Sequence, residues 1–187
     1  VYRQSDPVFI NILDHIRTSQ VATNDLMRLN HRVGAELDEG DSKLAITLST
    51  RRDTVDFINE NKLRELPGEP TLFRGTIEGD FPESSLPTPI ELYLKTGAQV
   101  IFIKNDIDHQ WVNGTLGTII GFDDDQDSRI YVRTENGEDV MVEPASWSNM
   151  RYHFNETEKK IEEEEIGRYL QYPIRLAWAI TVHKSQG

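Results

Sequence analysis

Hydrophobic positions near the start of the chain follow a helical spacing. Asp6 and Pro7 form a helix-start signal, because aspartate caps a helix and proline suits its first position. The apolar residues that follow at helical spacing are Phe9, Ile12, Leu13 and Ile16. A second helix is predicted to begin near residue 23.

A short apolar run interrupts this helical spacing. Residues 44–48 read LAITL, which is typical of a buried strand, and residues 53–66 return to helical spacing after a polar turn. Strand, turn and helix in this order form the unit of an α/β fold.

From residue 71 the chain changes to short alternating or apolar runs separated by turn signals such as Asn113-Gly114 and Asn136-Gly137. The predicted strands are residues 71–77, 98–104, 117–122, 129–133 and 139–142. We expect Gly117 to be a turn residue as well. Several short strands within roughly fifty residues favour a small barrel.

The last third returns to longer elements. Residues 151–154 predict one more strand, and the highly charged residues 156–169 fit either a hairpin or a helix. Residues 174–182 (IRLAWAITV) are almost continuously apolar, which predicts one strand buried on both faces. The organisation is therefore α/β, then a β-rich insertion, then α/β again.

Composition fits a globular protein. Of the 187 residues, 37% are hydrophobic and 28% are charged. No apolar run approaches the ~20 residues that span a membrane, and no signal-peptide pattern is present. Because the chain has no cysteine, disulfides and thiolate metal sites are excluded. We expect a cytoplasmic protein without membrane association.

The net charge of the chain argues against a nucleic-acid partner, but the distribution of charge along the sequence weakens that argument. The formal net charge is -12, and polyphosphate binding requires local positive charge. The acidic residues are concentrated in runs such as Glu162 to Glu165, however. Residues 168–187 contain three basic residues and no acidic one. Nucleic-acid binding therefore stays possible, since the local field decides it.

The chain lacks two common phosphate-binding motifs but contains one segment rich in hydrogen-bond donors. The chain has no G-x-x-x-x-G-K-[ST] and no G-x-G-x-x-G, so it should not hydrolyse ATP alone. Residues 181–187 (TVHKSQG) follow the apolar run and place hydrogen-bond donors at the carboxyl end of a strand, where α/β sheets bind ligands. The same residues fit a hydrophilic loop equally well.

Four segments carry a resemblance. They are VYRQSDPVFINILDHIR, LSTRRDTVDFINENKL, LKTGAQVIFIKND followed by WVNGTLGTIIGF, and LAWAITVHKSQG. In this order they resemble the second RecA-like domain of Pif/RecD-type DNA helicases, the 5′-to-3′ branch of superfamily 1. The resemblance covers essentially the whole chain.

The resemblance implies a fold: α/β, with a RecA-like parallel-sheet domain interrupted by a small Src-homology-3-like β-barrel insertion. The expected bounds are residues 1–90 for the first part of the RecA-like domain, 91–155 for the barrel and 156–187 for the return. The chain begins at Val1 inside one motif and ends at Gly187 after another, so we expect a piece of a longer protein.

The resemblance also implies an ATP-dependent DNA helicase as the parent. ATP and Mg²⁺ would be bound mainly by a first RecA-like domain, a partner outside this chain, and no metal site is expected here. Arg3 would be a catalytic arginine finger, which fits a planar, always charged donor. Residues near the nucleotide would be Gln4, Ser185, Gln186 and Gly187.

Single-stranded DNA is the implied partner. Thr50 would lie near the DNA backbone, with Arg51 assisting, and Thr181, His183 and Lys184 would contact the same strand. Among the three tryptophans, Trp111 is the best candidate for stacking on a base, whereas Trp178 lies in an apolar run and should belong to the core.

Two other functions stay open from the sequence. One is a non-catalytic binding module, in which the barrel recruits protein or nucleic acid. The other is a hydrolase that uses His183 with Ser185, but no acidic residue orients the histidine and no nucleophile elbow is present.

Overall fold

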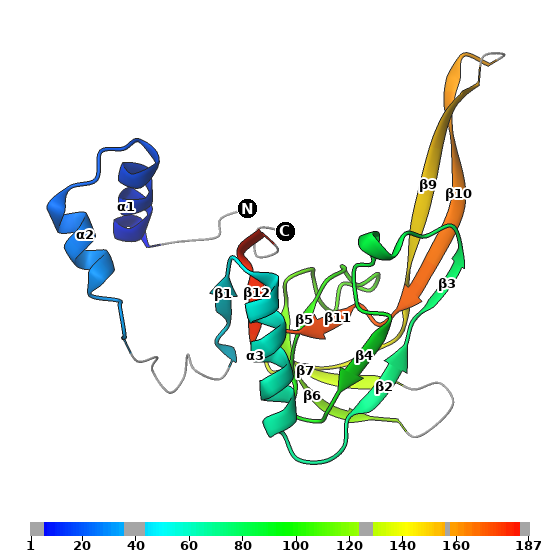
Figure 1. The fold of residues 1–187 in the computed structure, drawn as a ribbon, viewed down its shortest axis with the longest axis horizontal. Helices are drawn as coiled ribbons and strands as arrows, with labels where there is room; N and C mark the ends of the chain where they lie inside the picture. The colour runs from blue at the N-terminus through cyan, green and yellow to red at the C-terminus, as the bar shows by residue number, and fades with distance from the viewer. Residues whose placement is uncertain (1–5, 36–43, 124–128, 156–157, 184–187) are drawn as a thin grey trace. The chain divides into compact units, whose positions relative to one another are not determined.

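The computed structural model describes residues 6–35, 44–123, 129–155 and 158–183. The chain divides into two compact units, residues 1–43 and 44–187, called here the N-terminal unit and the C-terminal unit. Figure 1 labels the elements of both. Within the described ranges, no helix has the length and apolar character required to cross a membrane.

The N-terminal unit contains two helices, α1 (Pro7–Arg17) and α2 (Thr23–Asn30). Asp6 caps α1 as predicted: its Oδ1 accepts hydrogen bonds from the backbone N–H groups of Val8 at 2.8 Å and Phe9 at 3.3 Å. Because this carboxylate satisfies donors that have no partner within the helix, the sequence signal and the observed start coincide.

A short polar contact joins the two helices. His15 Nδ1 lies 2.7 Å from Asp25 Oδ2, and the same oxygen accepts a hydrogen bond from the backbone N–H of Ala22 at 3.0 Å. The Ala22 bond, followed by the His15 bond, lowers the pKa of Asp25. Asp25 is therefore held as an acceptor for both neighbours.

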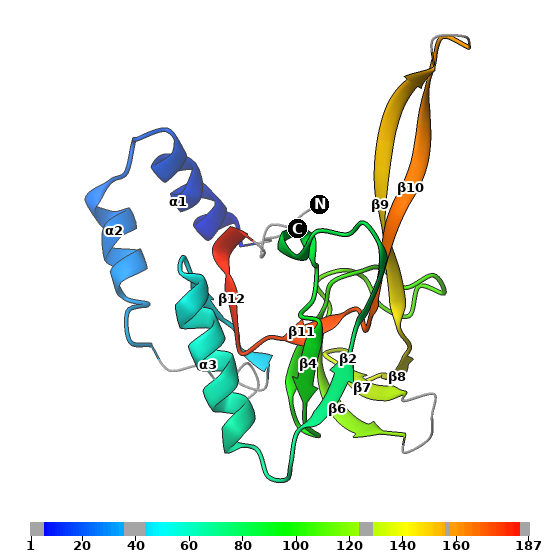
Figure 2. The same cartoon turned by 45° about the vertical axis from the view of Figure 1, so that its right-hand side comes forward.

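The C-terminal unit begins with the predicted α/β element. Strand β1 (Thr47–Ser49) pairs in parallel with β12 (Ala179–Thr181), and helix α3 (Arg52–Glu65) lies against both strands (Figure 2). The observed β1 starts three residues later than the predicted strand 44–48. Among the residues that the structure describes, β1 and β12 form the parallel sheet.

The apolar run 174–182 is not one strand, which corrects the prediction. It divides into β11 (Ile174–Leu176) and β12, which belong to different sheets. The change occurs at Ala177, whose N–H donates to the backbone carbonyl of Gln99 and whose carbonyl accepts a hydrogen bond from the Gln99 side chain, both at 2.9 Å. These bonds satisfy the backbone of Ala177 outside either strand.

The largest sheet is antiparallel, in the order β11-β5-β6-β7-β8. Its other strands are β5 (Gln99–Phe102), β6 (Leu116–Phe122), β7 (Ile130–Thr134) and β8 (Asp139–Val142). They confirm the strands predicted between residues 98 and 142. Since β11 joins this sheet, the sheet reaches beyond the expected barrel bounds of 91–155. Its likeness to a Src-homology-3 barrel stays a prediction.

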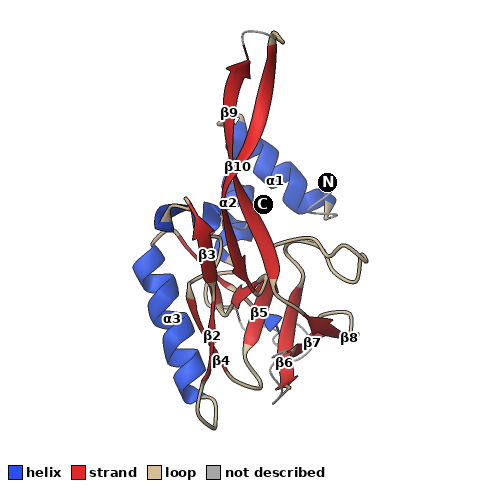
Figure 3. Ribbon diagram, turned by 90° about the vertical axis from the view of Figure 1, so that its right-hand side faces the viewer, coloured by secondary structure: helices blue, strands red, loops and turns tan. Residues whose placement is uncertain are grey.

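A long hairpin resolves the ambiguity over residues 156–169. Strand β10 (Lys160–Gln171) pairs with β9 (Ala145–Asn155), which includes the strand predicted at residues 151–154. Its inner part also pairs with β3 (Thr76–Gly79). Figure 3 shows the outer part of the hairpin extending beyond the other strands of the C-terminal unit.

Two further elements complete this unit, the antiparallel pair β2 (Thr71–Arg74) and β4 (Glu91–Leu94) and the short 3-10 helix η2 (Glu83–Ser85). Buried polar side chains hold the irregular connection before β4. The single proton of the Tyr169 hydroxyl is shared between the carbonyls of Thr88, at 3.2 Å, and Pro89, at 3.0 Å. Because these carbonyls lie outside any strand, such side-chain partners replace the missing ladder.

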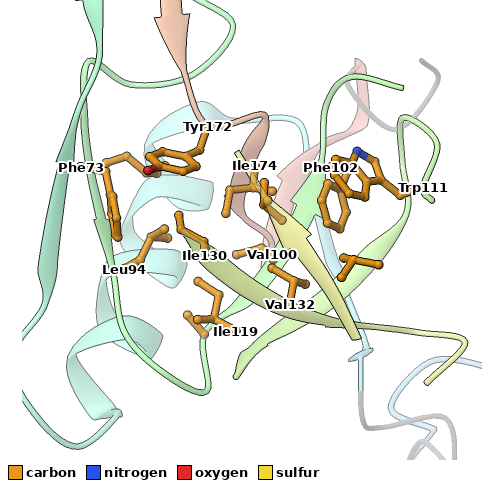
Figure 4. Close-up of a cluster of buried hydrophobic side chains, with 14 of the residues drawn as sticks. Phe73, Leu94, Val100, Phe102, Trp111, Ile119, Ile130, Val132, Tyr172 and Ile174 are labelled. Carbon is orange, nitrogen blue, oxygen red and sulfur yellow. The ribbon is translucent and has the colours of Figure 1, made fainter. Parts of the chain in front are cut away.

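One hydrophobic core joins α3 to the antiparallel strands (Figure 4). Its members on β4 to β8 and β11 include Leu94, Val100, Ile130, Val142 and Ile174, all with no exposed surface. Leu63 brings α3 into the same core. The helix and the large sheet are therefore parts of one packed body.

Gly117 is a strand residue, which corrects its prediction as a turn residue. A Cβ there would lie 2.4 Å from Val132 Cγ1 and 2.9 Å from the Arg133 carbonyl oxygen. We expect Gly117→Ala to lower the free energy of unfolding by about 1–3 kcal/mol through overpacking, measured by urea denaturation. Gly121→Ala in the same strand is the matched control, since no atom lies within 4 Å of its added Cβ. Equal losses in the two variants would contradict this steric explanation.

Candidate functional site

The candidate site is the edge where the parallel strands β1 and β12 both end. Ser49 is the register partner of Thr181, so Thr50, the residue after β1, lies beside the carboxyl end of β12. Thr50 is exposed, Thr181 is half-buried, and the exposed His183 follows two residues later. Segments about 130 residues apart in the sequence thus place Thr50, Thr181 and His183 at one edge. We call this the β1–β12 edge.

The local sequence explains the turn after β1. Ser49 Oγ accepts a hydrogen bond from the backbone N–H of Arg51 at 3.1 Å, which holds the chain as it enters α3. The edge therefore lies at the amino-terminal end of α3, where the helix dipole favours anions.

Arg51 is exposed but not isolated. Its Nε donates to Asp53 Oδ1 at 3.1 Å, and its Nη2 is hydrogen-bonded to Asp53 Oδ2. This bond raises the pKa of Arg51 and is the main reason that the pKa of Asp53 is lowered. An anion that binds Arg51 must therefore compete with a charged carboxylate, although the exposure of the pair weakens that competition.

Two other arginines contribute positive charge nearby. Arg52 Nε lies 3.9 Å from Asp56 Oδ2 in an exposed pair. Arg175 is partly buried, and its Nη1 donates to the carbonyl of Pro87 at 3.1 Å. Burial, followed by the charge of Arg52, lowers the pKa of Arg175. The local charge here is mixed, in contrast to the acidic chain as a whole.

This arrangement suits the binding of phosphate groups better than it suits catalysis. Hydroxyl, imidazole and guanidinium donors line the β1–β12 edge, and all of them fit phosphate oxygens. In the ranges that the structure describes, no three histidine or acidic side chains come together as a metal site. The remaining predicted residues, Arg3, Gln4, Lys184, Ser185, Gln186 and Gly187, lie outside the described ranges.

Trp111 is not placed to stack on a base. Its side chain is 7% exposed and stacks on Phe102 with ring centroids 4.5 Å apart, and its Nε1 donates to the Lys104 carbonyl at 3.1 Å. Both of these contacts fix the ring in the core (Figure 4). We therefore withdraw Trp111 from the candidate DNA-binding residues. Trp178 is partly buried and packs against the same core, as predicted.

Two buried carboxamides that support the edge were missed from the sequence. Asn59 on α3 hydrogen-bonds both backbone groups of Ala179, and the Gln99 side chain donates to the carbonyls of Ala45 and Ala177. The sequence does indicate that Asn59 is buried, because it lies four residues from both Val55 and Leu63 and therefore on the buried face of the helix.

Comparisons with known proteins agree on one family. No protein-family model matches the chain. The chain is 34% identical over 199 residues to an ATP-dependent DNA helicase PIF1 of Xenopus laevis and 31% identical over 201 residues to that of Homo sapiens. Both matches cover the whole chain but only 28% of the relative, in its C-terminal part.

Solved structures give the same result. A crystal structure of Bacteroides sp Pif1 in complex with ADP-AlF4 matches with a TM-score of 0.83 and 36% identity, over 99% of this chain and 41% of that one. Bacteroides Pif1 bound to ssDNA matches with a TM-score of 0.69 and 37% identity, over 100% of this chain and 42% of that one. The chain thus spans less than half of each of these proteins.

The placement of Trp111 can be tested by stability. We expect Trp111→Ala to lower the free energy of unfolding by about 3–5 kcal/mol, because it removes a large buried ring, measured by urea denaturation. Tyr152→Ala is the control, since this aromatic side chain is 62% exposed on the hairpin and should cost less than about 1 kcal/mol. A Trp111→Ala variant as stable as the parent would place the indole outside the core.

Proposed function

Because this chain is homologous over its whole length to the Pif1 DNA helicases, we propose that it forms the second motor domain of an ATP-dependent DNA helicase. The observation that carries the proposal is the β1–β12 edge, where Thr50 and Thr181 are neighbours through the Ser49–Thr181 register. A Pif1 structure bound to ssDNA is among its matches.

The proposed ligand of the edge is the backbone of single-stranded DNA. Thr50 and Thr181 donate hydroxyl hydrogen bonds to phosphate oxygens, while His183, Lys184 and Arg51 supply further donors. Such contacts are largely independent of sequence and sensitive to salt. This fits a motor that must move along any strand.

The proposed role in ATP hydrolysis belongs to the other end of the sequence. The chain has no P-loop motif, so ATP and Mg²⁺ are assigned mainly to a separate first RecA-like domain. Arg3 reaches the transferring phosphate from this chain, with Gln4 beside it. Residues 185–187, which follow the DNA-contacting segment directly, connect the nucleotide to the DNA edge.

The DNA contact is tested by substitution in the full-length protein. We expect Thr181→Ala and His183→Ala each to weaken binding of labelled oligothymidine about 3–10-fold, because each removes one net hydrogen bond. Fluorescence anisotropy at low and moderate salt measures this. His153→Ala is the control, an exposed histidine on the outer hairpin that pairs with Glu162.

Either of two results would count against the edge. Affinity that is unchanged in both variants would place the DNA elsewhere. Full affinity in both edge variants that is lost on substituting exposed residues of the antiparallel sheet would favour the binding-module alternative. Thermal melting of each variant separates both results from a loss of DNA affinity that is caused by unfolding.

The arginine finger is tested by activity. In the full-length helicase, we expect Arg3→Ala to reduce ATP hydrolysis on the order of 10³-fold, because the charge that stabilises the transferring phosphate is lost. Single-stranded DNA binding should persist. Arg17→Ala is the control, because Arg17 is an exposed residue of α1 paired with Asp14. Normal hydrolysis together with lost DNA binding would exclude the finger role.

A further inference from the structure

Asn59 makes a two-point contact with the strand that carries the DNA-contacting residues. Its Nδ2 donates to the Ala179 carbonyl at 2.9 Å, and its Oδ1 accepts a hydrogen bond from the Ala179 N–H at 2.9 Å. Asn59 is 8% exposed and Ala179 has no exposed surface. Water therefore cannot replace either bond.

This contact satisfies backbone groups of Ala179 that the pairing with β1 leaves free. Strand β12 has three residues, and in the described part of the chain its sheet partner is β1 alone. Backbone groups of Ala179 that are not bonded to β1 would otherwise be buried without partners. A carboxamide offers one donor and one acceptor at the spacing of a backbone amide, so it can satisfy both groups at once.

The same helix also controls the other half of the β1–β12 edge. Thr50 and Arg51 immediately precede α3, and Asn59 lies about two turns into it. Thr181 and His183 lie two and four residues beyond Ala179. One rigid helix thus sets the position of both groups of candidate DNA contacts.

We propose that Asn59 is a positioning residue for single-stranded DNA binding. It holds β12 against α3, so that Thr181 and His183 stay aligned with Thr50 and Arg51. This inference rests on the proposed function, because it concerns the same edge. Asn59 itself is buried and contacts the backbone of Ala179 rather than the DNA.

The test uses Asn59→Asp in the full-length protein, because the aspartate has the same shape and can be switched by pH. When ionised, it offers only acceptors and faces the Ala179 carbonyl without a donor. When protonated, it can again donate to that carbonyl and accept from the N–H. Burial and the facing carbonyl raise the pKa of this aspartate, while the Ala179 N–H opposes them by donating to one oxygen; we expect burial and the carbonyl to dominate, so the functional form is present at low pH and is lost as pH rises through that raised pKa.

The matched control is Asn61→Asp on the same helix. Asn61 Oδ1 accepts a hydrogen bond from Arg64 Nη1 at 3.0 Å, and a carboxylate keeps that acceptor. The control therefore introduces the same charge without removing a required donor. Asn59→Leu is the second control, because it cannot be rescued at any pH.

Two readouts are compared with wild type at each pH. At about pH 8, Asn59→Asp should bind labelled oligothymidine on the order of tenfold more weakly and should exchange the β12 amide hydrogens faster. Near pH 5.5 both differences should shrink toward zero. Asn61→Asp should match wild type at both pH values, and Asn59→Leu should stay impaired at both.

The outcomes separate this inference from the proposed function. Faster exchange in β12 with unchanged DNA affinity overturns the positioning role and leaves the DNA edge intact. Unchanged exchange in Asn59→Asp overturns the inference directly. If wild type does not bind single-stranded DNA, the proposed function fails, and the positioning role for DNA fails with it. Weaker binding that low pH restores only in Asn59→Asp supports the inference.

Discussion

The structure depends on satisfying buried backbone groups where the chain passes between its two kinds of sheet. After β11 the chain leaves the antiparallel sheet, and within three residues it enters the parallel pair with β1. Ala177 and Ala179 lie on this passage with no exposed surface. Gln99 bonds the N–H of Ala177 through its backbone carbonyl and the carbonyl of Ala177 through its side-chain amide. Asn59 bonds both the N–H and the carbonyl of Ala179 through its side-chain carboxamide. Because an unpaired buried amide costs about 1–3 kcal/mol, the passage can follow this path only with these partners.

That constraint explains where the candidate site lies. With the passage fixed, β12 is held parallel to β1, and Thr181 is aligned with Ser49. The donors then gather at the amino-terminal end of α3, although the chain as a whole has a formal net charge of -12. The acidic run Glu162 to Glu165 lies instead on the hairpin strand β10, in another sheet. Summed charge therefore misrepresents the β1–β12 edge, since the fold places this acidic run in another sheet and leaves Asp53 and Asp56, paired with Arg51 and Arg52, beside the donors.

The sequence predicted what short-range patterns encode. The Asp6 cap, helix α3 and the strands between residues 98 and 142 follow from local spacing and turn chemistry. The candidate donors Thr181 and His183 followed from the rule that α/β sheets bind ligands at the carboxyl ends of their strands, whereas Thr50 came from the family resemblance. Three features could not be read in this way. The division of residues 174–182 depends on Gln99, which is about 80 residues away, and the burial of Trp111 depends on Phe102. Gly117 resembles a turn glycine in sequence, but its role comes from Val132 on the neighbouring strand.

The same bonds limit how the β1–β12 edge can move. Gln99 lies on β5 of the antiparallel sheet, and its amide reaches Ala45 before β1 as well as Ala177 before β12. Leu63 of α3 is packed in the core of that sheet. To shift the edge against the sheet, the protein would have to break these buried hydrogen bonds and open the core, and each unpaired group would add about 1–3 kcal/mol. In this structure the edge and the antiparallel sheet are therefore joined as one packed body, and any motion between them in the proposed motor cycle requires these hydrogen bonds to break and re-form.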